Sequence, residues 1–555
     1  MKGGKITRRD FIKTLPVLST GFLVSCKLFN QFDILIKSGI VYDGEKNQIS
    51  VCDIGIKGDV IKAVEKQINS SADTVIDAKG LVVSPGFIDI HTHTDIELLI
   101  NPTADSKIMQ GVTTEVSGNC GFSPFPLNDQ QYRDYRDEMN RKYGVSPAWH
   151  SLSQFLEQIE ISKPSINYLT LTGHGRLRSY ILGNENIQPS PEQLRNMKEL
   201  LQQTLEEGSF GLSTGLEYSP GCFATIDELI ELCKVVKRYD GLYATHMRNE
   251  DDTLLEAIDE ALEISRKSGV NLEISHLKAC NVNNWGKIDT AIAKIEEASK
   301  TLPVHADRYP YNAWGTSLTT FLPKWARTGS SGDIIKRLKD RKTFKEITSY
   351  MYKRANRIGG WDKIMISRCN SAKNKVYEGK TLAQCSEISG LEPTEFVKKI
   401  LIEEKTDVSI IGFAMSEENL KKVLKCPLVM IGSDGNAISP KGILGKSNPH
   451  PRYYGTFPRV LGKYCRDEGI ISLLESLSKM TAMPAKKLGL NKRGFIKKGY
   501  YADITIFDFK KIIDKATYVK PHQFPEGIAY VIVNGKITVK NGRHLGTRAG
   551  KVLRK

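Results

Sequence analysis

The clearest indication of the fold is the segment Val83-Ser84-Pro85-Gly86-Phe87-Ile88-Asp89-Ile90-His91-Thr92-His93. Small turn-forming residues lead into a short apolar run at residues 87–91, which predicts a buried strand. His91 and His93 are separated by one residue, so both imidazoles lie on the same face of the strand and can reach one ion. A buried strand that ends in metal-binding side chains favours a barrel, because barrels carry their catalytic groups at the carboxyl ends of the strands.

Seven further short apolar runs follow this strand, and helical stretches separate them. Repeated β-α units of this kind predict an α/β protein with a TIM-like (β/α)8 barrel. Ser190 before Pro191, and Thr225 three residues before Glu228, predict the starts of two of the helices. The eight predicted strands are residues 87–91, 113–116, 167–173, 208–212, 243–246, 271–276, 304–309 and 428–434.

Residues 33–84 and 490–547 differ from the barrel region and resemble each other. In both, short alternating apolar segments are separated by Gly, Asp and Asn, which predicts one small β-sandwich domain formed by both chain ends. The barrel then takes residues 85–489. Its connection between strands 7 and 8 is far longer than usual, so we expect an insertion at about residues 316–425. Trp325 and Arg327 in this insertion are expected to shape the substrate pocket.

Potential metal ligands follow several of the predicted strands. Because the carboxyl ends of barrel strands meet at one rim, we expect these side chains to form one site. A thiolate among imidazoles favours Zn²⁺ over Mg²⁺ or Ca²⁺, which prefer oxygen ligands. Each residue alone is more often structural, since a lone buried His or Cys usually belongs to the core. The candidate ligands are His91, His93, Cys120, His246, His276 and Asp434.

These motifs resemble the D-aminoacylase (N-acyl-D-amino-acid deacylase) family of the amidohydrolase superfamily. The resemblance covers essentially everything after residue 33, and Cys120 in Gly118-Asn119-Cys120-Gly121 is its most specific feature. It implies zinc-dependent hydrolysis of the amide bond of an N-acyl-D-amino acid, which releases a carboxylate and a D-amino acid. The segments that carry it are residues 83–93, 110–121, 173–175, 211–218, 275–278, 309–311, 432–435 and 450–459.

The resemblance also implies a role for individual residues. Cys120, His246 and His276 would hold one zinc ion tightly, and His91, His93 and Asp434 would line a second position that is weak or empty. Asp434 would also act as general base and acid. The substrate carboxylate would be bound by Lys278, Tyr309 and Arg452.

Two departures from the family pattern limit what the resemblance implies. They are Glu217 before Tyr218 and Trp314 before Gly315, so the preferred substrate side chain is not transferable. For Glu217 and His174, a role in the pocket and a role in packing both stay open.

The first 32 residues resemble a bacterial export signal. Arg8-Arg9 lies in a basic segment before a short apolar stretch at residues 15–24, as in twin-arginine signals, and Leu23-Val24-Ser25-Cys26 is similar to a lipobox. We therefore expect export from the bacterial cytoplasm, with Cys26 lipidated, giving a periplasmic or membrane-anchored lipoprotein. A simple cleaved signal or an uncleaved anchor stays as the alternative.

Composition narrows the classes of partner. The chain has 79 Lys and Arg against 63 Asp and Glu, a net charge of +16, but the basic residues are not clustered. The charge is therefore compatible with anionic small molecules or anionic membrane surfaces, and we expect no nucleic-acid partner. The resemblance implies a small-molecule substrate, an N-acyl-D-amino acid, and no protein partner is inferred. The nine cysteines after Cys26 form no CxxC pair, so no disulfide framework is indicated. The alternative functions are another amidohydrolase acting on a cyclic amide, an imide or a dipeptide, and a non-catalytic exported binding lipoprotein.

Overall fold

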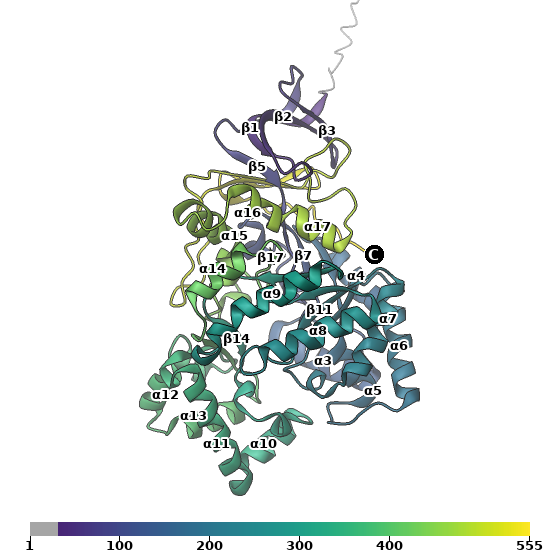
Figure 1. The fold of residues 1–555 in the computed structure, drawn as a ribbon. Coiled ribbons are helices and arrows are strands. Elements are labelled where there is room, and N and C mark those ends of the chain that lie inside the picture. The colour runs from purple at the N-terminus through teal and green to yellow at the C-terminus, as the bar shows by residue number, and fades with distance from the viewer. Residues whose placement is uncertain (1–30) are drawn as a thin grey trace, which may run out of the picture.

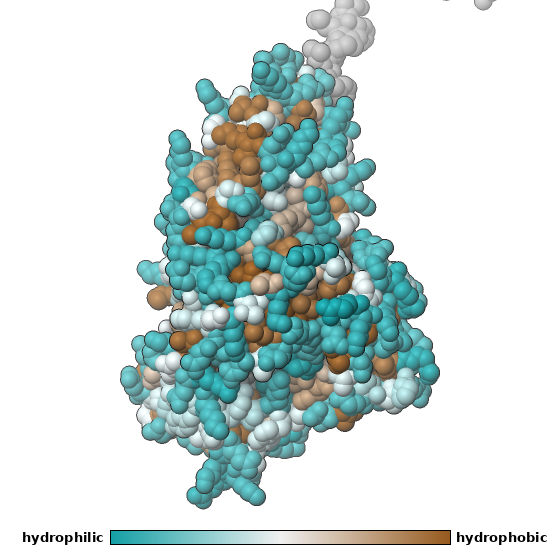
Figure 2. All heavy atoms as spheres, in the orientation of Figure 1, coloured by the Kyte–Doolittle hydropathy of each residue, from teal (hydrophilic) through white to brown (hydrophobic). Residues whose placement is uncertain are grey.

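The computed structural model describes residues 31–555, so the expected signal and Cys26 lie outside the described residues. A parallel barrel occupies the middle of the molecule, with a β domain at one end and a group of helices at the other (Figure 1). This arrangement confirms the predicted fold class. Most of the visible surface is hydrophilic, and apolar residues gather over the β domain near the top of the view (Figure 2).

The barrel strands are parallel, and two hydrogen-bonded groups of them close into one barrel. Closure between the last and first strands comes from Asp434, whose N–H donates to the carbonyl of His91 at 2.8 Å, and from a bridge between Thr92 and Gly435. The strands are β6 (Phe87–Asp89), β7 (Val112–Ser117), β8 (Asn167–Thr170) with β9 (Thr172–Gly173), β10 (Gly211–Gly215), β11 (Leu242–His246), β12 (Asn271–Ile274), β13 (Val304–Arg308) and β17 (Val429–Ile431).

Several strand predictions need correction. The first, sixth and eighth strands end at Asp89, Ile274 and Ile431, two or three residues before the predicted ends. The third strand is interrupted at Leu171, so it forms the two short pieces β8 and β9. The fourth begins at Gly211 and not at Gly208, because Gly208, with φ of +111°, belongs to the turn after the preceding helix. This shift moves Ser213, Thr214 and Gly215 into the strand.

The main helices outside the insertion surround the barrel. Ser190 forms a full capping box with Gln193, and the Thr225 hydroxyl accepts the N–H of Glu228, as predicted for these helix starts. They are α3 (Asp129–Tyr143), α4 (Leu152–Ser162), α5 (His174–Leu182), α6 (Pro191–Glu206), α7 (Ile226–Arg238), α8 (Leu254–Ser268), α9 (Ile288–Ser299), α14 (Glu417–Lys425), α15 (Arg452–Arg459), α16 (Leu473–Met480) and α17 (Ala482–Leu488).

The β domain is a nine-stranded sheet that joins the two ends of the described chain. Strand β18 pairs with β5, which links the C-terminal strands to the N-terminal ones, and isoleucines from both parts fill a shared core. Its strands are β1 (Phe32–Tyr42), β2 (Ile49–Lys57), β3 (Val60–Glu65), β4 (Ala72–Asp77), β5 (Val82–Pro85), β18 (Ile504–Phe507), β19 (Ile528–Val533), β20 (Lys536–Lys540) and β21 (Arg543–His544).

The insertion between β13 and β17 has its own sheet and its own apolar core. The sheet order is β14-β16-β15, and every pairing is antiparallel. Helix α14 packs on α9 and β17, and so covers the barrel. The insertion elements are β14 (Trp314–Ser317), α10 (Ser331–Lys339), α11 (Arg341–Ile358), β15 (Ile364–Arg368), α12 (Leu382–Ser389), α13 (Pro393–Glu403) and β16 (Ser409–Gly412).

Two features of the described residues bear on the sequence expectations. The nine cysteines in residues 31–555 are buried and unpaired, in line with the absence of a predicted disulfide framework. Over the same range, the structure contains no helix with the length and apolar character needed to cross a bilayer.

Candidate metal centre and substrate cavity

The barrel brings all six candidate ligands to one end of its strands. Their ligand atoms form two groups, each within 4.8 Å, and the Cys120 sulfur belongs to both groups. One group adds His91, His93 and Asp434, and the other adds His246 and His276. In chain order the six are His91 and His93 after β6, Cys120 after β7, His246 at the end of β11, His276 after β12 and Asp434 after β17.

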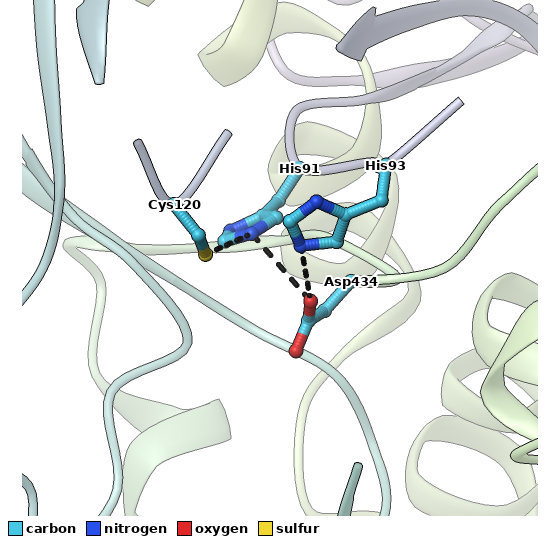
Figure 3. Close-up of side chains that lie close together, drawn as sticks. All are labelled: His91, His93, Cys120 and Asp434. Atoms are coloured by element: carbon cyan, nitrogen blue, oxygen red, sulfur yellow. Dashed lines mark hydrogen bonds and ion pairs between the residues drawn. The ribbon is translucent and has the colours of Figure 1, made fainter. Parts of the chain in front are cut away.

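Distances between the ligand atoms are short enough for shared coordination. The Sγ of Cys120 lies 3.4 Å from Nε2 of His91 and 3.5 Å from Nε2 of His276. Oδ1 of Asp434 lies 3.0 Å from Nε2 of His93 (Figure 3). His246 is buried, and within residues 31–555 neither of its ring nitrogens has a hydrogen-bond partner. Because buried polar atoms are normally satisfied, this imidazole fits a metal ligand.

Three of the six ligands have a backbone conformation that is rare outside glycine. Cys120, His276 and Asp434 have φ values of +53°, +38° and +50°. Each such residue costs about 1–3 kcal/mol and persists only where the surrounding structure imposes it. At Cys120 the constraint comes from Gly215, because a Cβ added to Gly215 would lie 2.0 Å from the Cys120 carbonyl oxygen. The close packing of the segment after β7 against the end of β10 therefore fixes the backbone that carries the thiol.

The electrostatics of the six residues favour a cation. Burial would raise the pKa of the Cys120 thiol, but neighbouring imidazoles, with His91 the strongest, hold that pKa well below its ordinary value. Burial would lower the pKa of His93 and of His246. Neighbouring carboxylates and the Cys120 thiolate outweigh burial and raise the pKa of His93 to about 9 and that of His246 to about 10. A bound cation can take the place of these protons, so this donor set fits a thiophilic metal such as zinc.

Two buried carboxylates that the sequence analysis missed orient the ligands. Asp307 accepts from Nδ1 of His91 and from the backbone N–H of His276, both at 3.0 Å. Oε1 of Glu250 lies 2.9 Å from Nδ1 of His276, and the Lys278 ammonium donates to it at 2.5 Å. Such partners fix the tautomer and direction of a ligating imidazole.

Only one of these two carboxylates left a signal in the sequence. Glu250 follows the predicted ligand His246 by four residues, close to the end of a predicted strand. Asp307 lies inside a strand whose residues are nearly all buried, so no alternation marked it as part of the site. Burial would raise the pKa of Glu250, but Lys278, His276 and His246 together lower it to about 2.

Lys278, Tyr309 and Arg452, the three residues expected to bind the substrate carboxylate, all line one cavity. Arg452 begins α15, and its Nη1 lies 2.9 Å from Oδ2 of Asp434. Its guanidinium stands 4.7 Å from the centre of the Tyr309 ring. Within residues 31–555, Tyr309 Oη and Arg452 Nε are buried and have no hydrogen-bond partner. These donors can serve a bound anion, whereas Lys278 is already engaged by Glu250.

A cavity of about 710 Å³ opens onto the metal centre. The insertion supplies part of its wall, including Trp314 and Arg354, but the prediction for Trp325 is wrong because that side chain is exposed outside the lining. Arg327 does not line the cavity either, and its guanidinium donates to the carbonyl of Glu217 at 3.3 Å. The Glu217 carboxylate lines the cavity and pairs with Arg354 at 3.2 Å.

His174 has a structural role. Its Nε2 lies 2.7 Å from Oε1 of the buried Glu228, and the side chain does not line the cavity. The two alternatives left open by the sequence are therefore resolved differently, with Glu217 in the pocket and His174 in the packing.

Comparison with known proteins gives consistent matches. The profile of the amidohydrolase family matches residues 74–307 and 400–539. D-aminoacylase from Alcaligenes xylosoxydans xylosoxydans is 33% identical over 94% of this chain and 97% of its own length. The N-acyl-D-glutamate deacylase of Bordetella bronchiseptica, solved with zinc and a phosphonate inhibitor, is 30% identical and superposes with a TM-score of 0.78, over 94% of this chain and all of that one. A D-aminoacylase structure described by its binuclear metal centre is 32% identical, with a TM-score of 0.79 over the same shares.

Proposed function

Because the chain belongs to the amidohydrolase family, in the D-aminoacylase group of these metal-dependent hydrolases, we propose that it uses zinc to hydrolyse N-acyl-D-amino acids. The products would be a carboxylate and a D-amino acid. One observation carries the proposal: the Cys120 thiol and the imidazoles of His93, His246 and His276 line the same cavity as two buried donors, Tyr309 Oη and Arg452 Nε. Neither donor has a hydrogen-bond partner among residues 31–555. This reaction needs two features: a metal ion that activates the amide, and hydrogen-bond donors that hold the free carboxylate of the substrate.

The family resemblance, together with the two groups of ligand atoms, supports one assignment of the ligands of the ion. Cys120, His246 and His276 would hold it tightly, and His91 and His93, with Asp434, would line a weaker second position. When bound, the ion supplies a Lewis acid that polarises the amide carbonyl and acidifies a water molecule.

Asp434 is placed to move the proton. Its carboxylate would take a proton from the attacking water and return one to the leaving amine nitrogen. Burial would raise the pKa of Asp434, but Arg452 and the histidines hold it well below its usual value. If the substrate carboxylate draws Arg452 away, Asp434 loses its strongest stabilising charge and becomes a better base. Substrate binding would then prepare the base for catalysis.

The test is a substrate profile with paired enantiomers. Zinc-loaded protein should release free amine from N-acetyl-D-amino acids and hardly any from the L forms. Asp434→Asn should lower kcat while the tightly bound zinc ion is retained. A broad D panel without turnover would contradict the proposal. Activity on hydantoins, dihydroorotate or isoaspartyl dipeptides alone would replace it with another amidohydrolase reaction, and a protein that binds no zinc would favour a binding lipoprotein.

We further propose that the enzyme works outside the cytoplasm, on the basis of Arg8-Arg9 and the lipobox-like segment that ends at Cys26. The lipid anchor would hold it to the membrane, with the substrate on the periplasmic side. Fractionation of the producing cells tests this, because Arg8→Lys combined with Arg9→Lys should retain the protein in the cytoplasm. Mass spectrometry should find a diacylglyceryl group on Cys26, and an unmodified thiol there would exclude the anchor.

A further inference from the structure

Eight of the nine Lys and Arg side chains that line the cavity fall into two sets, and the ninth, Arg357, pairs with Asp252 outside the lining. In the first set each cation is matched by a carboxylate of the same cavity wall, so the end near the metal centre is close to neutral. These pairs are Lys278 with Glu250, Arg354 with Glu217, and Arg452 with Asp434.

The second set is not matched in this way. We call it the mouth cluster: Arg141 and Lys142 at the end of α3, Arg368 at the end of β15, Lys375, and Lys446 in the loop after β17. All five line the cavity, and they come from three segments that are far apart in the sequence.

Contacts join four members of the mouth cluster in two pairs. Lys142 and Arg368 share one carboxylate, Asp407, with Lys142 at 2.6 Å. The Lys375 ammonium donates to the backbone carbonyl of Lys446 at 3.1 Å. Two cationic side chains that share one carboxylate keep hydrogen-bond donors for another anion.

Fewer carboxylates than cations lie within ion-pair distance in the cluster. Asp407 and Glu138 pair with Lys142, Asp407 also pairs with Arg368, and Glu378 pairs with Lys375. Arg141 and Lys446 have no carboxylate within ion-pair distance in the part of the chain that the structure describes. The Lys142 side chain is only 15% exposed, which limits the screening of its charge by solvent.

We infer that the mouth cluster binds a second anionic group of the substrate. The inference rests on the proposed function and narrows it: the preferred substrates are N-acyl-D-amino acids that carry another carboxylate or phosphate remote from the α-carboxylate. The α-carboxylate occupies the donors of Tyr309 and Arg452 at the metal end. A cavity of 710 Å³ is large enough for a substrate that extends from there to the mouth cluster. Arginine suits this task because its planar guanidinium binds carboxylates and phosphates with two parallel hydrogen bonds.

The anion can stand on the acyl group or on the amino-acid side chain, and two substrate pairs distinguish these sources. N-succinyl-D-leucine is compared with N-butanoyl-D-leucine, and N-acetyl-D-2-aminoadipate with N-acetyl-D-norleucine. In at least one pair the charged member should have about a tenfold higher kcat/KM, and this preference should fall as ionic strength rises.

Arg368→Gln and Lys142→Gln should each reduce that preference about tenfold. Two variants are used so that a folding defect in one does not decide the result. The matched control is Arg357→Gln, since Arg357 also lines the cavity but pairs with Asp252, outside the mouth cluster, and its loss should leave the preference intact.

Calorimetry of the same four compounds measures binding without turnover. Tighter binding of a charged member, lost in Arg368→Gln and Lys142→Gln but kept in Arg357→Gln, supports the inference even if none of the compounds is cleaved. Equal kcat/KM and equal binding within both pairs overturns the inference, while the cleavage of uncharged N-acyl-D-amino acids leaves the proposed function standing. A preference that persists in both cluster variants also overturns it.

Discussion

Replacing Glu250 with Gln tests the idea that a buried carboxylate organises the metal centre. The Glu250 side chain is 8% exposed and serves two partners, Nδ1 of His276 at 2.9 Å and the ammonium of Lys278 at 2.5 Å. Gln keeps the shape and removes the charge. Lys278, only 6% exposed, then holds a buried charge without its counter-ion, which costs about 3–5 kcal/mol of stability in the metal-free protein.

The same change should weaken zinc binding by about 10–100-fold, because His276 loses the acceptor that fixes its tautomer. Competition with a chromophoric chelator measures zinc affinity, and chemical denaturation of the metal-free protein measures stability. Glu260→Gln is the matched control, since it removes a carboxylate that binds Arg248 away from the metal centre. Zinc affinity within threefold of the wild type, together with a stability loss no larger than that of the control, would refute the reasoning.

Three further predictions follow from the site and the core. Cys120→Ser should lower zinc affinity by more than about 100-fold, because a serine hydroxyl stays protonated at neutral pH; metal analysis showing full zinc occupancy after dialysis would contradict this. Arg452→Gln should raise KM by about 10–100-fold for free acids but much less for their methyl esters, and an equal effect on both would exclude a carboxylate contact. Burial lowers the pKa of Lys487 to about 7 and that of Lys479 to about 8, below the unfolded value of 10.5. Between pH 7 and 10 the unfolded chain therefore binds more protons than the folded protein. The free energy of unfolding should thus increase with pH across that window. Lys487→Met should remove up to about 2 kcal/mol of the rise between pH 7 and 9 in denaturation experiments, and an unchanged rise would refute the assignment.

The fold could be predicted because local patterns repeat. Apolar runs that alternate with capped helices define β-α units, and the long gap before residues 428–434 signals an insertion. The strand edges were less predictable, because they depend on turns. Gly208, for example, continues an apolar-looking segment in the sequence but takes a positive φ in the chain, which delays the strand to Gly211.

The grouping of the six candidate ligands could also be predicted, because each of them lies at or just after a predicted strand end. The pocket could not. Trp325 is a plausible pocket residue by its chemistry, but the packing of the insertion leaves its side chain in solvent. The mouth cluster could not be predicted from the sequence, because Lys142, Arg368 and Lys446 lie far apart along the chain. Each of them has the sequence context of an ordinary surface charge.

Side-chain periodicity and residue chemistry are local properties, so the barrel, its candidate metal ligands and the family could be recognised from the amino-acid sequence. The tertiary structure established which side chains lie close together. It set the positive φ values of Cys120, His276 and Asp434, and it placed Glu250 and Asp307 behind the ligands. These features depend on contacts between segments that are distant in the sequence. Such contacts hold the backbone in strained conformations and bring buried charges together, and both effects cost free energy. A local sequence pattern therefore cannot predict them.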